Sequence, residues 1–122
     1  MIKFKTIKNN ETAEIEEKRS RFIASIYYVE TVEEAEEAIK QTKKKYYDAK
    51  HNCFAYIINE KENILKRFSD DGEPNGTAGS PILNTIEKNN LCNVLAIVTR
   101  YFGGILLGTG GLVRAYTEAA NK

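Results

Sequence analysis

Residues 91–99, LCNVLAIVT, form an almost unbroken apolar run with the length of one β-strand. Such a run predicts a central strand that is covered on both faces, or one that helices cover. Two more segments, 21–29 (RFIASIYYV) and 51–59 (HNCFAYIIN), are rich in aromatic and β-branched residues and also predict strands. We therefore expect a chain built around a sheet.

Helices and hairpins are predicted between these strands. Thr31 and Glu34 have the spacing of a capping box, which predicts a helix from Thr31 to about Tyr47. Ser80 and Pro81 indicate a second helix start, with the Ser80 hydroxyl as the cap. Segment 108–120 predicts the third helix, and the remaining strands are predicted at 12–18 and 64–69. The expected class is α+β, a mixed sheet with the helices on one face.

Composition favours a water-soluble globular domain. The chain has 122 residues, of which 42% are hydrophobic and 29% charged. No apolar run approaches the ~20 residues that span a bilayer, and the N-terminus lacks a signal-peptide core. We expect a cytoplasmic protein without a membrane partner. Cys53 and Cys92 are predicted to be buried reduced thiols, and the single histidine argues against a multi-histidine metal centre.

The charge balance does not predict a nucleic-acid binder as a whole, because the formal net charge is only +1. Lysines cluster in residues 40–50, KQTKKKYYDAK, which could form a local basic patch. The preferred interpretation is the last turn of a helix, where cations oppose the negative end of the helix dipole.

All eight glycines and both prolines lie between positions 72 and 111, so irregular loops are expected there. In the first loop, Asp70, Asp71 and Glu73 could bind Mg²⁺ or could simply form an acidic turn. Residues 76–79 then lead into a helix start, where free N–H groups favour an anion. Acids beside such a terminus predict a mixed-sign site suited to a polar or zwitterionic partner.

The second glycine-rich stretch is residues 100–116, RYFGGILLGTGGLVRAY. Exposed amides together with Arg100 and Arg114 could hold phosphate there, and close packing of helix against strand explains the glycines equally well. The pattern is neither a P-loop nor a dinucleotide fingerprint. His51 and Cys53 share one strand face, so a nucleophile pair is conceivable, but a buried thiol beside a groove-lining histidine is the preferred interpretation.

Three motifs together carry a family resemblance. AKHNCFAY (49–56), FSDDGEPNGTAGSPIL (68–83) and VTRYFGGILLGTGGLVRAY (98–116) resemble the signature of the Impact/YigZ family. The resemblance implies a fold similar to domain 2 of ribosomal protein S5. Bacterial relatives continue into a ferredoxin-like C-terminal domain to which nothing here corresponds. Residues 1–122 are therefore expected to be a single Impact N-terminal-type domain, a fragment of a longer protein.

For function, the resemblance implies binding rather than catalysis, and no cofactor. The leading hypothesis is a module in or near translation whose partner is RNA, the ribosome or a translation-associated protein. In the RNA version, Tyr101 or Phe102 would stack on a base while arginines meet phosphate. The alternative is a Mg²⁺-dependent enzyme acting on a phosphorylated or nucleotide small molecule. A third possibility is that the loops dock the missing domain.

The residues predicted to form one surface groove come from the three motifs. They are His51, Asp70, Asp71, Gly72, Glu73, Pro74, Gly76, Thr77, Gly79, Arg100, Tyr101, Phe102, Gly103, Gly104, Gly108, Thr109, Gly110, Gly111 and Arg114.

Overall fold

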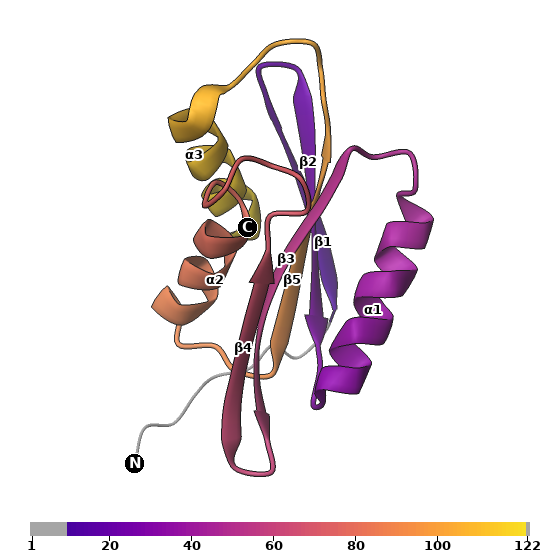
Figure 1. Cartoon of the computed structure of the whole chain (residues 1–122), viewed down its shortest axis with the longest axis vertical. Helices are drawn as coiled ribbons and strands as arrows, with labels where there is room; N and C mark the ends of the chain where they lie inside the picture. The colour runs from indigo at the N-terminus through magenta and orange to yellow at the C-terminus, as the bar shows by residue number, and fades with distance from the viewer. Residues whose placement is uncertain (1–9, 122) are drawn as a thin grey trace.

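Five strands form one sheet in the order β1-β2-β5-β3-β4 (Figure 1). In the computed structural model, which describes residues 10–121, the strands are β1 (Glu11–Glu17), β2 (Ser20–Tyr28), β3 (His51–Glu60), β4 (Asn63–Ser69) and β5 (Val94–Tyr101). The helices are α1 (Val32–Lys45), α2 (Gly79–Lys88) and α3 (Gly108–Ala120). The predicted order of elements and the α+β class are confirmed.

The central strand is β5, which contains most of the apolar run 91–99. It pairs antiparallel with both β2 and β3, and the outer strands β1 and β4 are also antiparallel to their neighbours. The prediction of a mixed sheet is therefore wrong. The two strands that α1 connects, β2 and β3, do run in the same direction, but β5 lies between them and pairs with both.

Helices cover both faces of the sheet, not one face as predicted (Figure 1). One core contains Ala35 and Ile39 of α1 together with Phe54 and Leu95 of the sheet. The other core contains side chains of α2 and α3 packed on the alternate residues of β3 and β5. The sequences of β3 and β5 are apolar almost without interruption because both faces of these strands are buried.

The predicted cap of α1 is confirmed, since the Thr31 hydroxyl accepts a hydrogen bond from the Glu34 N–H at 3.1 Å. None of the described helices is both long and apolar enough to cross a membrane. Cys53 and Cys92 are buried and free, as predicted.

The predicted cap of α2 is wrong. The helix begins at Gly79, and no side chain caps it at the N-cap residue Ala78. Instead, Asp70 accepts hydrogen bonds from the N–H groups of Ala78 and Gly79, at 3.1 and 2.8 Å, through one carboxylate oxygen. Its other oxygen accepts from the Gly76 N–H at 3.0 Å. An anion does occupy the helix start, but it is the chain's own Asp70.

This assignment of the cap predicts different effects for two substitutions. Asp70→Ala removes the acceptor of three backbone N–H groups and is expected to lower the free energy of unfolding by about 1–3 kcal/mol. Ser80→Ala is expected to change it by less than about 0.5 kcal/mol. Urea unfolding of both variants measures the difference, and a larger loss for Ser80→Ala would contradict Asp70 as the cap.

Candidate functional site

A groove of about 460 Å³ opens where the start of β3, the loop after β4, the end of β5 and the start of α3 meet. The predicted site residues that line it are His51, Gly72, Glu73, Pro74, Arg100, Phe102, Gly108 and Thr109. Residues outside the prediction complete the lining: Lys50, Leu106, Leu107 and Leu112. The structure thus brings together parts of all three motifs.

A buried ion pair between Arg100 and Glu73 lies in this lining. Arg100 Nη1 donates to Glu73 Oε1 at 3.0 Å and to Oε2 at 2.8 Å. The two side chains are only 7% and 3% exposed. Tyr116 of α3 donates its hydroxyl to Glu73 Oε2. Phosphate binding was one of the two roles considered from the sequence for the segment that contains Arg100, whereas in the structure the charge of Arg100 is balanced by Glu73 inside the fold.

The rest of the Arg100 side chain is also enclosed. Its Nη2 lies 3.4 Å from the hydroxyl of Ser20, which also accepts from the Gly103 N–H at 3.3 Å. The guanidinium carbon lies 5.7 Å from the ring centre of Phe22 and 5.5 Å from that of Phe102. Within the described part of the chain, Arg100 Nε is a buried side-chain atom without a hydrogen-bond partner. Aromatic faces stabilise a cation in such a position.

His51 is held on two sides by the acidic loop. Its Nδ1 lies 2.9 Å from the main-chain oxygen of Asp71, and its Nε2 lies 3.5 Å from Glu73 Oε1. Gly72, with φ of +90°, packs so closely that a Cβ there would lie 3.3 Å from His51 Nδ1. His51 therefore lines the groove as a ring fixed in orientation.

Cys53 and Tyr116 form the inner end of this network. The Cys53 thiol donates to the main-chain oxygen of Asp70 at 3.1 Å and lies 3.4 Å from the Tyr116 hydroxyl. Burial raises the pKa of the Cys53 thiol and of the Tyr116 phenol far above their ordinary values. A thiol that stays protonated is a poor nucleophile, which disfavours the conceivable Cys53–His51 pair.

The three carboxylates of the acidic loop do not converge. Asp70 caps α2, and Asp71 accepts from the Asn52 N–H at 2.8 Å and lies 3.5 Å from Lys43 Nζ. Glu73 pairs with Arg100. Over residues 10–121, no group of three His, Cys, Asp or Glu side chains is arranged to hold a metal ion. The Mg²⁺ site considered from the sequence is therefore not formed by these three residues.

Two of the glycines are required by close packing. A Cβ on Gly103 would lie 1.9 Å from the main-chain oxygen of Arg19, in the turn between β1 and β2. A Cβ on Gly79 would lie 2.8 Å from the main chain of Ser69. At these positions the packing explanation of the glycines holds, because no side chain fits there.

Several predicted site residues lie away from the groove. The Tyr101 hydroxyl donates to Asp48 at 2.8 Å, and its ring packs on Tyr46. Desolvation and the bond to Asp48 raise the pKa of Tyr101 to about 12. Arg114 and Gly111 line a separate small hollow. The groove lining also omits Asp70, Asp71, Gly76, Thr77, Gly79, Gly103, Gly104 and Gly110.

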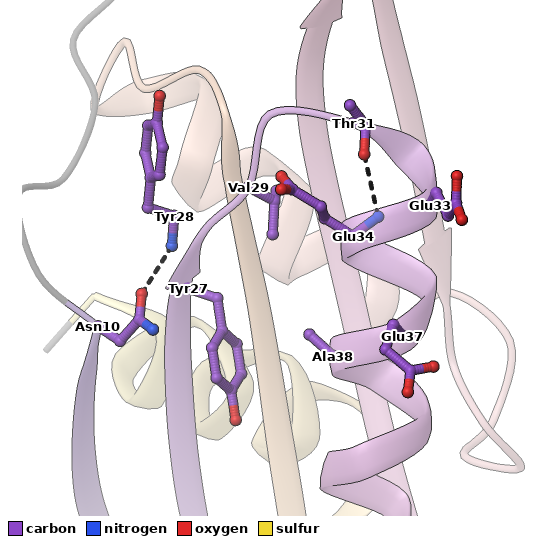
Figure 2. A pocket seen from close by; sticks show the side chains of 9 residues that line it. All are labelled: Asn10, Tyr27, Tyr28, Val29, Thr31, Glu33, Glu34, Glu37 and Ala38. Atoms are coloured by element: carbon purple, nitrogen blue, oxygen red, sulfur yellow. Dashed lines mark hydrogen bonds between the residues drawn. The ribbon is translucent and has the colours of Figure 1, made fainter.

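A second hollow, of about 540 Å³, lies between the end of β2 and the first turns of α1 (Figure 2). Its lining includes Tyr28 and three acidic side chains of α1, Glu33, Glu34 and Glu37. Of these, Glu34 is engaged by the turn before α1, because its carboxylate accepts from the Glu30 N–H at 2.7 Å. None of the residues predicted for the site lies in this hollow.

Sequence reasoning missed the partners of Arg100. Ser20 precedes a predicted strand without any special signal, and Tyr116 has the spacing of an ordinary core residue of the last helix. One signal was present for Glu73: an arginine that directly follows a run of buried strand residues needs an acidic partner nearby. Lys50 and Leu106 carry no local signal for a groove.

The buried pair predicts a large difference between two substitutions of cationic residues. Arg100→Ala leaves Glu73 buried without its counter-charge and is expected to lower the free energy of unfolding by about 3–5 kcal/mol. Lys66→Ala breaks a 2.7 Å pair with Glu87 whose side chains are 46% and 40% exposed. Its expected effect is below about 1 kcal/mol. Denaturant unfolding tests this, and equal effects would contradict the role of Arg100.

The raised pKa values of Cys53 and Tyr116 predict lower stability at alkaline pH. Above about pH 9–10, unfolded chains release these two protons whereas the folded state keeps them, so the free energy of unfolding falls as pH rises. Each group contributes a slope of about 1.4 kcal/mol per pH unit. Tyr116→Phe is expected to make the fall above pH 10 shallower. Urea unfolding of the original chain and of Tyr116→Phe between pH 8 and 11 measures how the free energy of unfolding changes with pH. The same pH dependence in both would contradict the assignment of this fall to Tyr116.

The sequence of the chain is similar to those of known proteins from one family. The chain is 48% identical to the IMPACT family member YvyE of Bacillus subtilis over 117 residues, covering 96% of this chain and 54% of YvyE. It is 42% identical to the IMPACT family member YigZ of Escherichia coli, covering 86% of this chain and 52% of YigZ. The chain thus spans about half the length of these curated relatives.

Solved structures agree with the fold. One crystal structure of a hypothetical protein matches with a TM-score of 0.91 at 39% identity, over 97% of this chain and 58% of that chain. The two-domain translational regulator Yih1 matches with a TM-score of 0.64 at 24% identity, over 99% of this chain and 51% of that one, a likeness of fold alone. The model of the Impact N-terminal domain matches residues 18–122. The chain therefore belongs to the Impact N-terminal domain family.

Proposed function

We propose that this chain is a non-catalytic binding module linked to translation or its regulation, and that it engages a translation-associated protein through the groove. The observation that carries the proposal is the contrast between the buried, internally neutralised Arg100 and the apolar side chains exposed beside it. Phe102 is 44% exposed, and Leu106 is 81% exposed. Exposed apolar side chains that gather at a preformed groove are typical of protein-binding surfaces.

The link to translation rests on the family. The resemblance to the Impact/YigZ family implies that eukaryotic relatives regulate translation through protein contacts. The S5 domain 2-like fold implied by the same resemblance remains part of the proposal.

A protein partner is favoured over RNA on electrostatic grounds. RNA binding would need cations free to meet phosphate, and Arg100 is occupied by Glu73. Arg114 lines another hollow, so the groove keeps Lys50 as its exposed cation. Of the two aromatic residues considered for base stacking, Phe102 lines the groove and Tyr101 does not. The formal net charge of +1 also favours a protein partner over RNA.

The alternative of a Mg²⁺-dependent enzyme receives less support. Asp70, Asp71 and Glu73 are each engaged by other groups of the chain, so a metal ion would have to displace those contacts. Of the titratable groups in the groove, His51 and Glu73 are each held by hydrogen bonds or ion pairs within the fold, whereas Lys50 is exposed. Cys53, the nucleophile considered from the sequence, is buried and does not line the groove.

The proposal predicts that one substitution at the rim of the groove weakens binding. Leu106→Glu places a charge on an exposed apolar contact and is expected to weaken co-sedimentation with purified ribosomes and their associated factors by at least tenfold. Tyr47→Glu is the control, because Tyr47 is 83% exposed and lies outside the groove lining. The bound fraction is measured at low and high salt. Capture of ribosomal and associated proteins on the immobilised chain is measured before and after ribonuclease treatment, because ribonuclease breaks up the ribosome itself.

The expected result is binding that survives ribonuclease and changes little with salt. Binding that disappears with ribonuclease and falls steeply with salt would support the RNA alternative instead. Equal binding by the Leu106→Glu and Tyr47→Glu variants would overturn the groove as the contact surface. Thermal stabilisation by Mg²⁺ with a nucleotide would favour the enzyme alternative.

A further inference from the structure

The outer strand β4 presents an open edge of the sheet. Within residues 10–121 it is the last strand in the order and pairs only with β3. Its side chains are exposed along almost its whole length, and three of them are large and apolar: Ile64 at 42%, Leu65 at 38% and Phe68 at 49% exposure. An edge of this kind can pair with another extended chain.

The turn of the hairpin determines which backbone groups are free. Lys61 and Glu62 both have positive φ, 51° and 66°, and Glu60 lies opposite Asn63, as in a two-residue type I′ turn. Glu60 and Asn63 then form the hydrogen-bonded pair next to the turn, and bonded and non-bonded pairs alternate along the hairpin. Consequently Ile64, Lys66 and Phe68 direct their N–H and C=O groups away from β3.

The same three residues share one face of the sheet. Lys66 identifies this face as that of α2, because its Nζ lies 2.7 Å from Glu87 Oε2. Ile64 and Phe68 flank Lys66 two residues away on either side, and all three side chains are 42–49% exposed. The three residues whose main-chain N–H and C=O groups are free therefore also present, in order along the strand, an apolar, a basic and an apolar side chain.

We propose that β4 accepts an extended segment of a partner protein by strand addition, and that this segment carries an acidic residue with apolar residues two positions away on each side. Main-chain hydrogen bonds would supply the affinity, and the three alternate side chains would supply the selectivity. Lys66 pairs with Glu87, but its side chain is 46% exposed, so a carboxylate of the added strand would approach it from the solvent side.

Electrostatic repulsion disfavours a second copy of β4 as the strand that pairs with this edge. Two β4 strands in full antiparallel register would place Lys66 directly opposite the Lys66 of the other copy, and like charges at that position are destabilising. An acidic residue in the position opposite Lys66 makes the interaction attractive instead. The other edge of the sheet differs, because the equivalent outward positions of β1 are Thr12, Glu14 and Glu16. The two glutamates place charge along that edge, which disfavours strand addition.

A short peptide tests the proposal. The probe is an acetylated and amidated heptapeptide in which two valines flank a central glutamate at a spacing of two residues, with threonine elsewhere. On addition of millimolar peptide to the isotope-labelled chain, amide exchange at Ile64, Lys66 and Phe68 is expected to slow at least tenfold. Leu65 and Arg67 are internal controls, because their N–H groups already bond to β3 and change little.

A charge swap supplies the second readout. Lys66→Glu is expected to weaken binding of this peptide at least tenfold and to bind a lysine-centred version better than the original chain does. Lys88→Glu, on the exposed surface of α2, is the matched control and is expected to bind as the unmodified chain does. Leu106→Glu tests independence from the groove and is also expected to leave peptide binding unchanged.

Three results would overturn the proposal. The first is the absence of any change at Ile64, Lys66 and Phe68 with millimolar peptide. The second is equal binding of the two peptides by the Lys66→Glu variant. The third is protection of the same amides without peptide, accompanied by concentration-dependent sedimentation, because the occupant would then be a second copy of this chain.

Discussion

The buried pair of Arg100 and Glu73 is the interaction on which the candidate groove depends. Arg100 lies one residue before the end of the central strand β5, Glu73 belongs to the loop before α2, and Tyr116 brings α3 to the same carboxylate. Ser20 adds the first residue of β2. Elements distant in sequence thus meet at one charge pair. Because a buried charge is costly without its partner, each contact constrains the position of the others.

The secondary structure could be predicted from sequence because its causes are local. The Thr31 cap and the apolar runs of β3 and β5 act within a few residues, and the predicted elements follow from them. The arrangement of helices over the sheet was predicted wrongly, although the same runs contained the information. A strand such as residues 51–59 without polar alternation needs cover on both faces, and helices confined to one face cannot provide it.

The site was harder to predict because sequence shows residue types and not their partners. Asp70 and Arg100 both have the appearance of ligand-binding residues, one before a helix start and one beside glycines. Asp70 instead binds amides six to nine residues later, and Arg100 binds a carboxylate 27 residues earlier. Gly103 resembles a ligand-binding glycine in the same way, but the Arg19 backbone occupies the space that its missing side chain leaves.

The groove and the β4 edge recognise partners by different physical means. The groove offers fixed apolar side chains around a neutralised charge pair, so its selectivity depends on shape and on exclusion of water. The edge offers main-chain groups, which any extended chain can match, so its selectivity depends on Lys66 and its two apolar neighbours. The β3–β4 turn and the start of α3 lie toward opposite ends of the sheet in Figure 1. A partner that reached both would make its second contact intramolecularly and would bind more tightly than through either surface alone.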